Sequence, residues 1–200
     1  MRKALNPRLL TAAEFVRQGA RFADVGTDHA YLPIFLLSEG KISHAVCSDI
    51  NEGPLASAVA NAREAGLYEK MDFVLTDGAA ALAPYGITDI AICGMGGDLI
   101  AAIVEAADFL FDPSINLILQ PMTKQEALRE RLYLKGFEIV AESYSRDAGK
   151  PYVCMQVKYT GEKKTLSEPE REICPKSAKI VNKNLQNPLI YILLREKAKK

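Results

Sequence analysis

The fold class follows from one stretch near the N-terminus, Arg21-Phe22-Ala23-Asp24-Val25-Gly26-Thr27-Asp28-His29. Its apolar first half predicts a buried strand, and Gly26 predicts a turn directly after it. A helix is then expected over residues 31–40, where apolar residues recur at helical spacing and a glycine ends the pattern. A strand, a turn and a helix in this order form the repeating unit of a parallel sheet.

The same alternation continues to about residue 160. Further strands are expected over 44–50, 71–75, 88–93, 116–119, 137–144 and 152–159. Further helices are expected over 5–16, 54–65, 98–111 and 123–135, the last with a capping box of Thr123 and Glu126. The final two strands are joined by so short a link that they must be antiparallel neighbours. We therefore predict an α/β fold with a mostly parallel seven-stranded sheet, an antiparallel last strand and helices on both faces.

Two parts of the chain are distinguished by their composition. Residues 1–160 are expected to form one domain, with an N-terminal helix within 1–20 that brings Arg8 to the rim of the sheet. Residues 161–200 begin polar and rich in turns and continue as a basic, helical segment. The net charge of zero hides a segregation, because residues 24–120 carry three basic and fourteen acidic side chains while residues 176–200 carry seven basic and one acidic. This pattern favours a centre that holds an uncharged or cationic ligand and flanks that meet a polyanion, unless the segments do not map onto faces of the fold.

The composition excludes several classes of protein. With 48% hydrophobic and 25% charged residues in a chain of 200, it is not collagen-like, disordered or a disulfide scaffold. No apolar run approaches the length of a membrane span, and no signal peptide is expected, so we predict a cytoplasmic protein. The four cysteines form no Cys-x-x-Cys pair, and the two histidines, His29 and His44, do not combine with them in a zinc-ligand pattern, so no metal site is expected.

Four successive strands end in polar or glycine-containing turns, which would meet at one edge of the sheet. In an open parallel sheet the ligand lies at this edge, where the strand order reverses. The turns are Asp24–His29, Asp49-Ile50-Asn51, Asp77-Gly78 and Gly94-Met95-Gly96-Gly97.

The chemistry of these turns predicts the cofactor. The first has one glycine where a dinucleotide fingerprint needs three, and Asp24 and Asp28 would repel a pyrophosphate. Asp49 follows Asp24 by 25 residues, near the offset at which an acid accepts two ribose hydroxyls, and Asp77-Gly78 could accept from an adenine amine. S-adenosyl-L-methionine is an adenosine that carries no phosphate, and its sulfonium and α-amino groups are cationic, so it suits a site with several acids. Its product is S-adenosyl-L-homocysteine. The predicted cofactor-binding residues are Asp24, Gly26, Thr27, Asp28, His29, Asp49, Ile50, Asn51, Asp77, Gly78, Gly94, Met95 and Gly96.

Several motifs resemble those of the bacterial tRNA adenine-22 N1-methyltransferases, in the same order. They are Asp24-Val25-Gly26-Thr27-Asp28-His29-Ala30-Tyr31-Leu32-Pro33, Asp49-Ile50-Asn51-Glu52-Gly53-Pro54, Cys93-Gly94-Met95-Gly96-Gly97 and Leu119-Gln120-Pro121. The resemblance covers about residues 5–160. It implies a Rossmann-like class I methyltransferase domain, followed by a smaller helical domain resembling a coiled coil, of which residues 161–200 are expected to be part.

The resemblance implies methyl transfer to N1 of adenine 22 in tRNA. We expect no membrane or metal partner; a monomer is favoured, although the sequence does not decide whether two copies associate. Adenine N1 attacks without losing a proton, so positioning carries most of the catalysis. The catalytic candidates are Asp28 and His29, near the transferred methyl, with Gly94 and Met95, whose turn could accept from the adenine amine. The candidates for substrate binding are Arg8, on a phosphate, Tyr31, stacked on the base, and Gln120 and Pro121. The alternatives are a methyltransferase acting on a small molecule or protein, and an RNA-binding module without turnover.

Overall fold

The computed structural model describes residues 5–167 and residue 171. Its centre is a seven-stranded sheet in the order β3-β2-β1-β4-β5-β7-β6. The strands are β1 (Phe22–Val25), β2 (Ala45–Asp49), β3 (Met71–Leu75), β4 (Asp89–Gly96), β5 (Asn116–Thr123), β6 (Phe137–Asp147) and β7 (Lys150–Tyr159). All neighbours from β3 to β5 are parallel, whereas β7 is antiparallel to both β5 and β6. The predicted fold class, with its antiparallel last strand, is confirmed.

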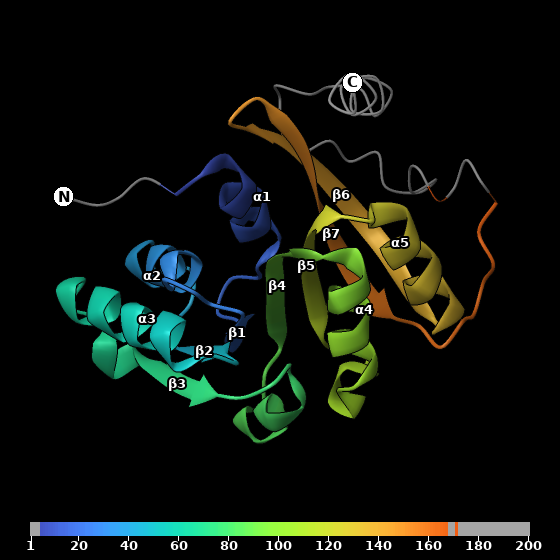
Figure 1. The fold of residues 1–200 in the computed structure, drawn as a ribbon. Coiled ribbons are helices and arrows are strands. Elements are labelled where there is room, and N and C mark those ends of the chain that lie inside the picture. Colours follow the sequence, from blue (N-terminus) through green and yellow to red (C-terminus); the bar gives the residue numbers. More distant parts are fainter. Residues whose placement is uncertain (1–4, 168–170, 172–200) are drawn as a thin grey trace.

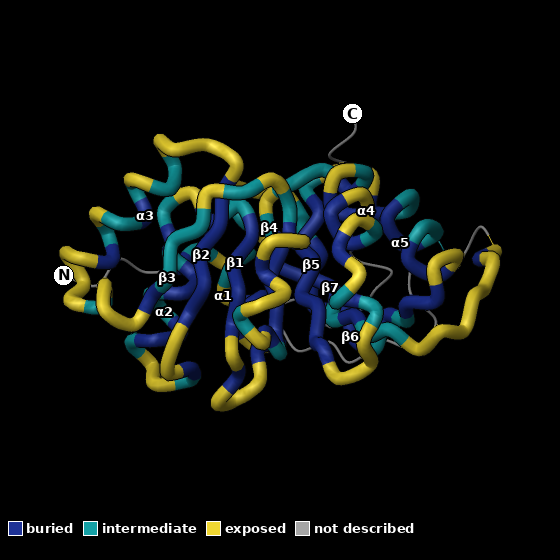
Figure 2. The backbone as a smooth tube through the Cα atoms, turned by 90° about the horizontal axis from the view of Figure 1, so that it is seen from below, coloured by how far each residue is buried: buried dark blue, intermediate teal, exposed yellow. Residues whose placement is uncertain are grey.

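Helices cover both faces of the sheet (Figure 1). They are α1 (Pro7–Phe15), α2 (Tyr31–Ser38), α3 (Glu52–Glu64), α4 (Gly97–Glu105) and α5 (Gln125–Leu134), with short 3-10 helices at Tyr68–Lys70, Ala80–Tyr85 and Asp108–Leu110. One apolar core lies between the sheet and α1, α2 and α3, and the other lies between the sheet and α4 and α5. The central strands are accordingly buried along their length, as Figure 2 shows, because both of their faces are covered.

A buried polar network fixes α1 against the amino end of the sheet. The Asp89 carboxylate at the start of β4 accepts hydrogen bonds from the Arg17 backbone N–H and from Asn116 Nδ2, both at 2.8 Å. Asn116 Nδ2 also donates to the carbonyl of Phe15 at 3.0 Å. This anchor at the end of α1 orients the helix across the sheet, so that its first turn reaches the opposite, carboxyl edge.

Three local predictions are wrong. Thr123 lies in β5 and the helix that follows begins at Gln125, with Lys124 in a left-handed conformation at its N-cap, so the predicted capping box of Thr123 and Glu126 does not form. The helix predicted over 98–111 ends at Glu105 and is followed by a 3-10 helix. The turns expected at Gly94-Met95-Gly96 and at Gln120-Pro121 are part of β4 and β5, which continue as an irregular pair with shifts of register.

The segment that follows β7 contacts the core between the sheet and helices α4 and α5. Leu166 is buried within it, and Arg129 Nη1 donates to the carbonyl of Arg171 at 3.0 Å. The basic helix predicted over 176–200 lies outside the described residues. Among the described residues, no helix has both the length and the apolarity needed to cross a membrane.

Candidate active site

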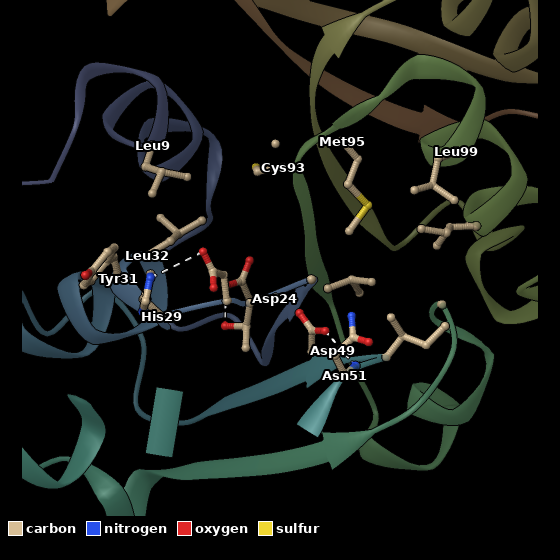
Figure 3. A pocket seen from close by; sticks show the side chains of 18 of the residues that line it. Leu9, Asp24, His29, Tyr31, Leu32, Asp49, Asn51, Cys93, Met95 and Leu99 are labelled. Atoms are coloured by element: carbon tan, nitrogen blue, oxygen red, sulfur yellow. Dashed lines mark hydrogen bonds and ion pairs between the residues drawn. The ribbon is translucent and has the colours of Figure 1, made fainter. Parts of the chain in front are cut away.

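A cavity of about 550 Å³ opens at the carboxyl ends of β1 to β4. It lies beside the point where the strand order reverses between β1 and β4, the place at which open α/β sheets bind ligands. The four predicted turns all reach its wall, and the first turn of α1 and one face of α4 complete it. Figure 3 shows Asp24 and Asp49 on one side and Met95 and Leu99 on the other.

The first turn contains three residues with positive φ, two of which are not glycine. Gly26 has φ +72°, and a Cβ added there would lie 2.1 Å from the Met95 Cε atom. Asp28 and Ala30 also have positive φ values, 43° and 55°, which are uncommon for residues other than glycine. The backbone N–H groups of Gly26 and Thr27 both donate to the carbonyl of Ser48, at 2.8 and 3.0 Å. These hydrogen bonds tie the strained turn to β2. Strained backbone of this kind is concentrated in ligand-binding sites.

Asp24 places a buried carboxylate at the cavity. Burial raises its pKa to about 6, a hydrogen bond of 2.7 Å from Thr27 Oγ1 partly offsets this effect, and the nearby charge of Asp49 adds to it. In the part of the chain that the structure describes, no basic side chain pairs with Asp24. A ligand that brings a positive charge next to Asp24 would be stabilised there, because the protein leaves this charge uncompensated.

Because the pKa of Asp24 is raised, the free energy of unfolding should depend on pH through this residue. The folded state holds this proton more tightly than the unfolded state, whose pKa is near 3.8, so the carboxyl costs stability as the pH rises from about 4 to about 6. Above pH 6 the cost is complete and on the order of 3 kcal/mol. We expect Asp24→Asn to raise the free energy of unfolding of the ligand-free protein at pH 7, and the gain to shrink toward pH 4.

Urea unfolding of both proteins at several pH values measures this difference. Asp77→Asn, the same change at an exposed acid of the same cavity, is the control and should show little dependence on pH. A gain for Asp24→Asn that stays constant between pH 4 and 7 would contradict the assignment.

Asp49 lies at the end of β2 and is also almost fully buried. Its Oδ1 atom accepts a hydrogen bond of 2.9 Å from the Asn51 backbone N–H, which orients the carboxylate at the cavity wall. The wall beside it is apolar, since Ile50 and Leu99 keep 60% and 54% of their surface exposed there. A carboxylate beside exposed aliphatic side chains suits a ligand with vicinal hydroxyls and a flat apolar ring.

The α1 side of the cavity carries polar and aromatic groups. Arg8, Asn6 and Leu9 reach it from the first turn of α1. The rings of His29 and Tyr31 are stacked with centroids 5.0 Å apart, and His29 Nε2 lies 3.6 Å from Asp28 Oδ2.

Arg8 is engaged with the protein itself. Its Nη1 donates to Gln120 Oε1 at 2.8 Å, its Nε lies 3.2 Å from Asp147 Oδ2, and its guanidinium stands 5.3 Å from the ring centre of Tyr152. Arg8 therefore connects α1 to β5 and to the end of the β6–β7 hairpin.

The structure brings most of the predicted site residues together. Those that line the cavity are Arg8, Asp24, Gly26, Thr27, Asp28, His29, Tyr31, Asp49, Ile50, Asn51, Asp77, Gly78, Gly94 and Met95. Gly96, Gln120 and Pro121 do not line it, and Gln120 is buried beneath Arg8. The cavity is also lined by residues that were not predicted from the sequence, namely Asn6, Leu9, Thr76, Leu99 and Ile103.

In the sequence Leu99 looks like an apolar core residue of its helix, but in the structure it faces the cavity. Its position one residue before the core residue Ile100, close to the start of α4, is the signal that could have identified it. Cys93 also reaches the cavity, and loss of hydration raises the pKa of its thiol well above the usual range. The Cys93 thiol therefore stays protonated. Within the described residues no cluster of metal-ligating side chains was found.

Comparison with known proteins agrees with this site. A family model described as a methyltransferase domain matches residues 5–155. The chain is 36% identical over 148 residues to the tRNA (adenine(22)-N(1))-methyltransferase of Bacillus subtilis, an alignment that covers 74% of this chain and 62% of the relative.

Solved structures are similar as well. A candidate tRNA (m1A22) methyltransferase of Streptococcus pneumoniae, in complex with S-adenosyl-L-methionine, is 38% identical with a TM-score of 0.81, over 96% of this chain and 87% of that one. TrmK of M. capricolum, in complex with S-adenosyl-homocysteine, is 26% identical with a TM-score of 0.76, over 98% and 96%. The resemblance seen in the sequence motifs is confirmed: the chain belongs to the family of tRNA (adenine(22)-N(1))-methyltransferases.

Proposed function

We propose that this chain transfers a methyl group from S-adenosyl-L-methionine to N1 of an adenine in tRNA, at position 22 as in the relatives. The observation that carries the proposal is the pair of buried carboxylates, Asp24 and Asp49, in a cavity with exposed aliphatic walls at the switch point of the sheet. These groups suit an adenosine that carries positive charge and no phosphate.

The residues present fit this cofactor. We assign the ribose hydroxyls to Asp49, the adenine to the aliphatic surfaces of Ile50 and Leu99, and the cationic end to the surroundings of Asp24. When bound, S-adenosyl-L-methionine supplies an electrophilic methyl group on a sulfonium. Gly26 lets the Met95 side chain pack directly on the backbone of this turn, because a Cβ at Gly26 would lie 2.1 Å from Met95 Cε.

The side chains next to the target base have little proton transfer to perform. Adenine N1 has a free lone pair, so no base has to deprotonate it, and alignment of the reacting atoms supplies most of the rate. The methylated ring is cationic, and we assign the backbone carbonyls of Gly94 and Met95 to its exocyclic amine. We assign Asp28 and His29 to the surroundings of the methyl group, and Tyr31 to the base. Because N1 is occupied in a Watson–Crick pair, the base has to swing out of its helix to reach them.

The remaining assignments follow from the family. Residues 1–160 are proposed as the methyltransferase domain, and residues 161–200 as part of a second, RNA-gripping domain. The basic composition of residues 176–200 supports a polyanionic partner. We further propose that the protein acts as a monomer in the cytoplasm.

Methyl transfer to tRNA tests this function directly. Unmodified tRNA transcripts are incubated with the protein and S-adenosyl-L-methionine labelled in the methyl group, and the RNA is digested to nucleosides. We expect labelled 1-methyladenosine, and none from a transcript in which adenine 22 is replaced by guanine. Absence of label from every tRNA tested would overturn the substrate, and label in a small molecule or protein would favour the alternative enzyme class.

A further inference from the structure

The cavity itself repels a nucleic acid. Four acids line it at the carboxyl ends of β1, β2 and β3 and in the turns that follow, namely Asp24, Asp28, Asp49 and Asp77. A phosphate backbone approaching this half of the carboxyl edge would meet like charges. If tRNA is the substrate, as proposed above, its phosphates must be held by cations elsewhere on the same edge.

Arg8 does not suit this role. Its guanidinium donates to Gln120, pairs with Asp147 and packs beside Tyr152, and its side chain keeps 19% of its surface exposed. A phosphate at Arg8 would share the guanidinium with the Asp147 carboxylate and lie beside its negative charge. The phosphate contact predicted for Arg8 is therefore better supplied by neighbouring cations.

The β6–β7 hairpin extends past the rest of the sheet beside Arg8. Pairing of β5 with β7 ends at Leu119 and Met155, whereas β6 and β7 remain paired to Asp147 and Lys150. Figure 1 shows this two-stranded end projecting on the side of α1. Arg8 ties it to the cavity wall through Asp147. The tip is therefore linked to the cavity wall through Arg8.

Two cations stand at this tip, on either side of the paired Asp147. Arg146 and Lys150 are exposed, and neither forms an ion pair with any residue in 5–167 or with residue 171. Between them in the chain lie Asp147 and a two-residue turn, Ala148 and Gly149, in which both φ values are positive. Arg146 pairs in register with Pro151 and Lys150 with Asp147, so the two cations project from opposite faces of the ribbon.

We propose that the tip of the β6–β7 hairpin, through Arg146 and Lys150, contacts tRNA phosphates beside the target nucleotide. The tip combines unpaired positive charge, exposure on both faces and a fixed link to the cavity. Arg8 acts here as a positioning residue that holds the tip in place. This inference rests on the proposed function and assigns the side from which the RNA approaches.

The test compares the double variant Arg146→Gln/Lys150→Gln with a matched control, Lys70→Gln/Lys163→Gln. The control also removes two exposed cations, but Lys70 precedes β3 and Lys163 follows β7, so both lie toward the amino edge. The full chain is titrated with unmodified tRNA at several salt concentrations, and the Kd for S-adenosyl-L-methionine is measured by calorimetry. Methyl transfer gives kcat and KM for tRNA.

For the hairpin variant we expect a Kd for tRNA about tenfold higher at low salt, with a salt dependence reduced by roughly 1 to 2 in the log–log slope. The KM for tRNA should rise while kcat and the Kd for the cofactor change little. If wild-type protein methylates tRNA and the two variants bind tRNA equally well, the hairpin contact is wrong and the proposed function stands. If wild-type protein neither binds nor methylates tRNA, the proposed function fails and the hairpin contact fails with it.

Discussion

Replacement of Asp49 by alanine is expected to raise the Kd for S-adenosyl-L-methionine by about 100-fold or more. A hydrogen bond to a charged group contributes about 1.5–3 kcal/mol, and a carboxylate facing two ribose hydroxyls makes two of them. The cavity supplies no second acid at the end of β2 that could take over, since the next residues are Ile50 and Asn51. Isothermal titration of both proteins with the cofactor measures the difference.

The control for Asp49 is Glu52→Gln, which removes an exposed acid from the first turn of α3. This change should leave the Kd within about twofold, because exposed charges act weakly across solvent. Thermal unfolding verifies that both variants remain folded, which matters because Asp49 also accepts the Asn51 N–H. A folded Asp49→Ala protein that binds the cofactor as tightly as wild type would refute the ribose assignment.

Substitution of Gly97 by alanine is expected to destabilise the protein by about 3 kcal/mol and to lower the melting temperature by about 6–12 °C. A Cβ at Gly97 would lie 2.3 Å from the carbonyl oxygen of Lys124, a backbone atom that cannot rotate away. The turn that begins α4 would have to separate from the one that begins α5. Because Met95 and Leu99 flank Gly97 and line the cavity, cofactor affinity should fall as well.

Gly53→Ala is the matched control for Gly97→Ala. Gly53 is also in the first turn of a helix, but a Cβ there meets nothing within 4 Å and its φ is negative. The replacement should raise stability by up to about 1 kcal/mol, since alanine favours the helix. Calorimetric melting of the two variants decides the matter, and equal melting temperatures for both would contradict the close packing at Gly97.

The alternation of strands and helices was sufficient to predict the sheet, because buried parallel strands are apolar along their whole length. The strands predicted over 44–50 and 71–75 correspond closely to β2 and β3. The helix of 98–111 was predicted too long, since its apolar residues continue past Glu105 into a 3-10 helix that packs in the same core. Apolar spacing alone does not distinguish these two kinds of turn.

The part of the cavity wall formed by polar and glycine-containing strand ends could be predicted from the sequence. The part formed by apolar side chains of packed helices could not. The carboxyl ends of the apolar strands β1 and β2 carry Asp24, Gly26 and Asp49, so the topology brings them together. Leu9 and Leu99 look like core residues in the sequence, and only the orientation of α1 and α4 turns them toward the cavity. The partners of Arg8 are more than 100 residues distant in the chain, which no local pattern reveals.

We place S-adenosyl-L-methionine in the cavity at the carboxyl ends of β1 to β4. A crystal structure of the full chain grown with this cofactor tests it most directly. We expect the ribose hydroxyls within hydrogen-bond distance of Asp49, the adenine between Ile50 and Leu99, and the sulfonium on the side of Asp24. Cofactor bound at another place, or a cavity that the chain fills with its own side chains at saturating cofactor, would contradict it.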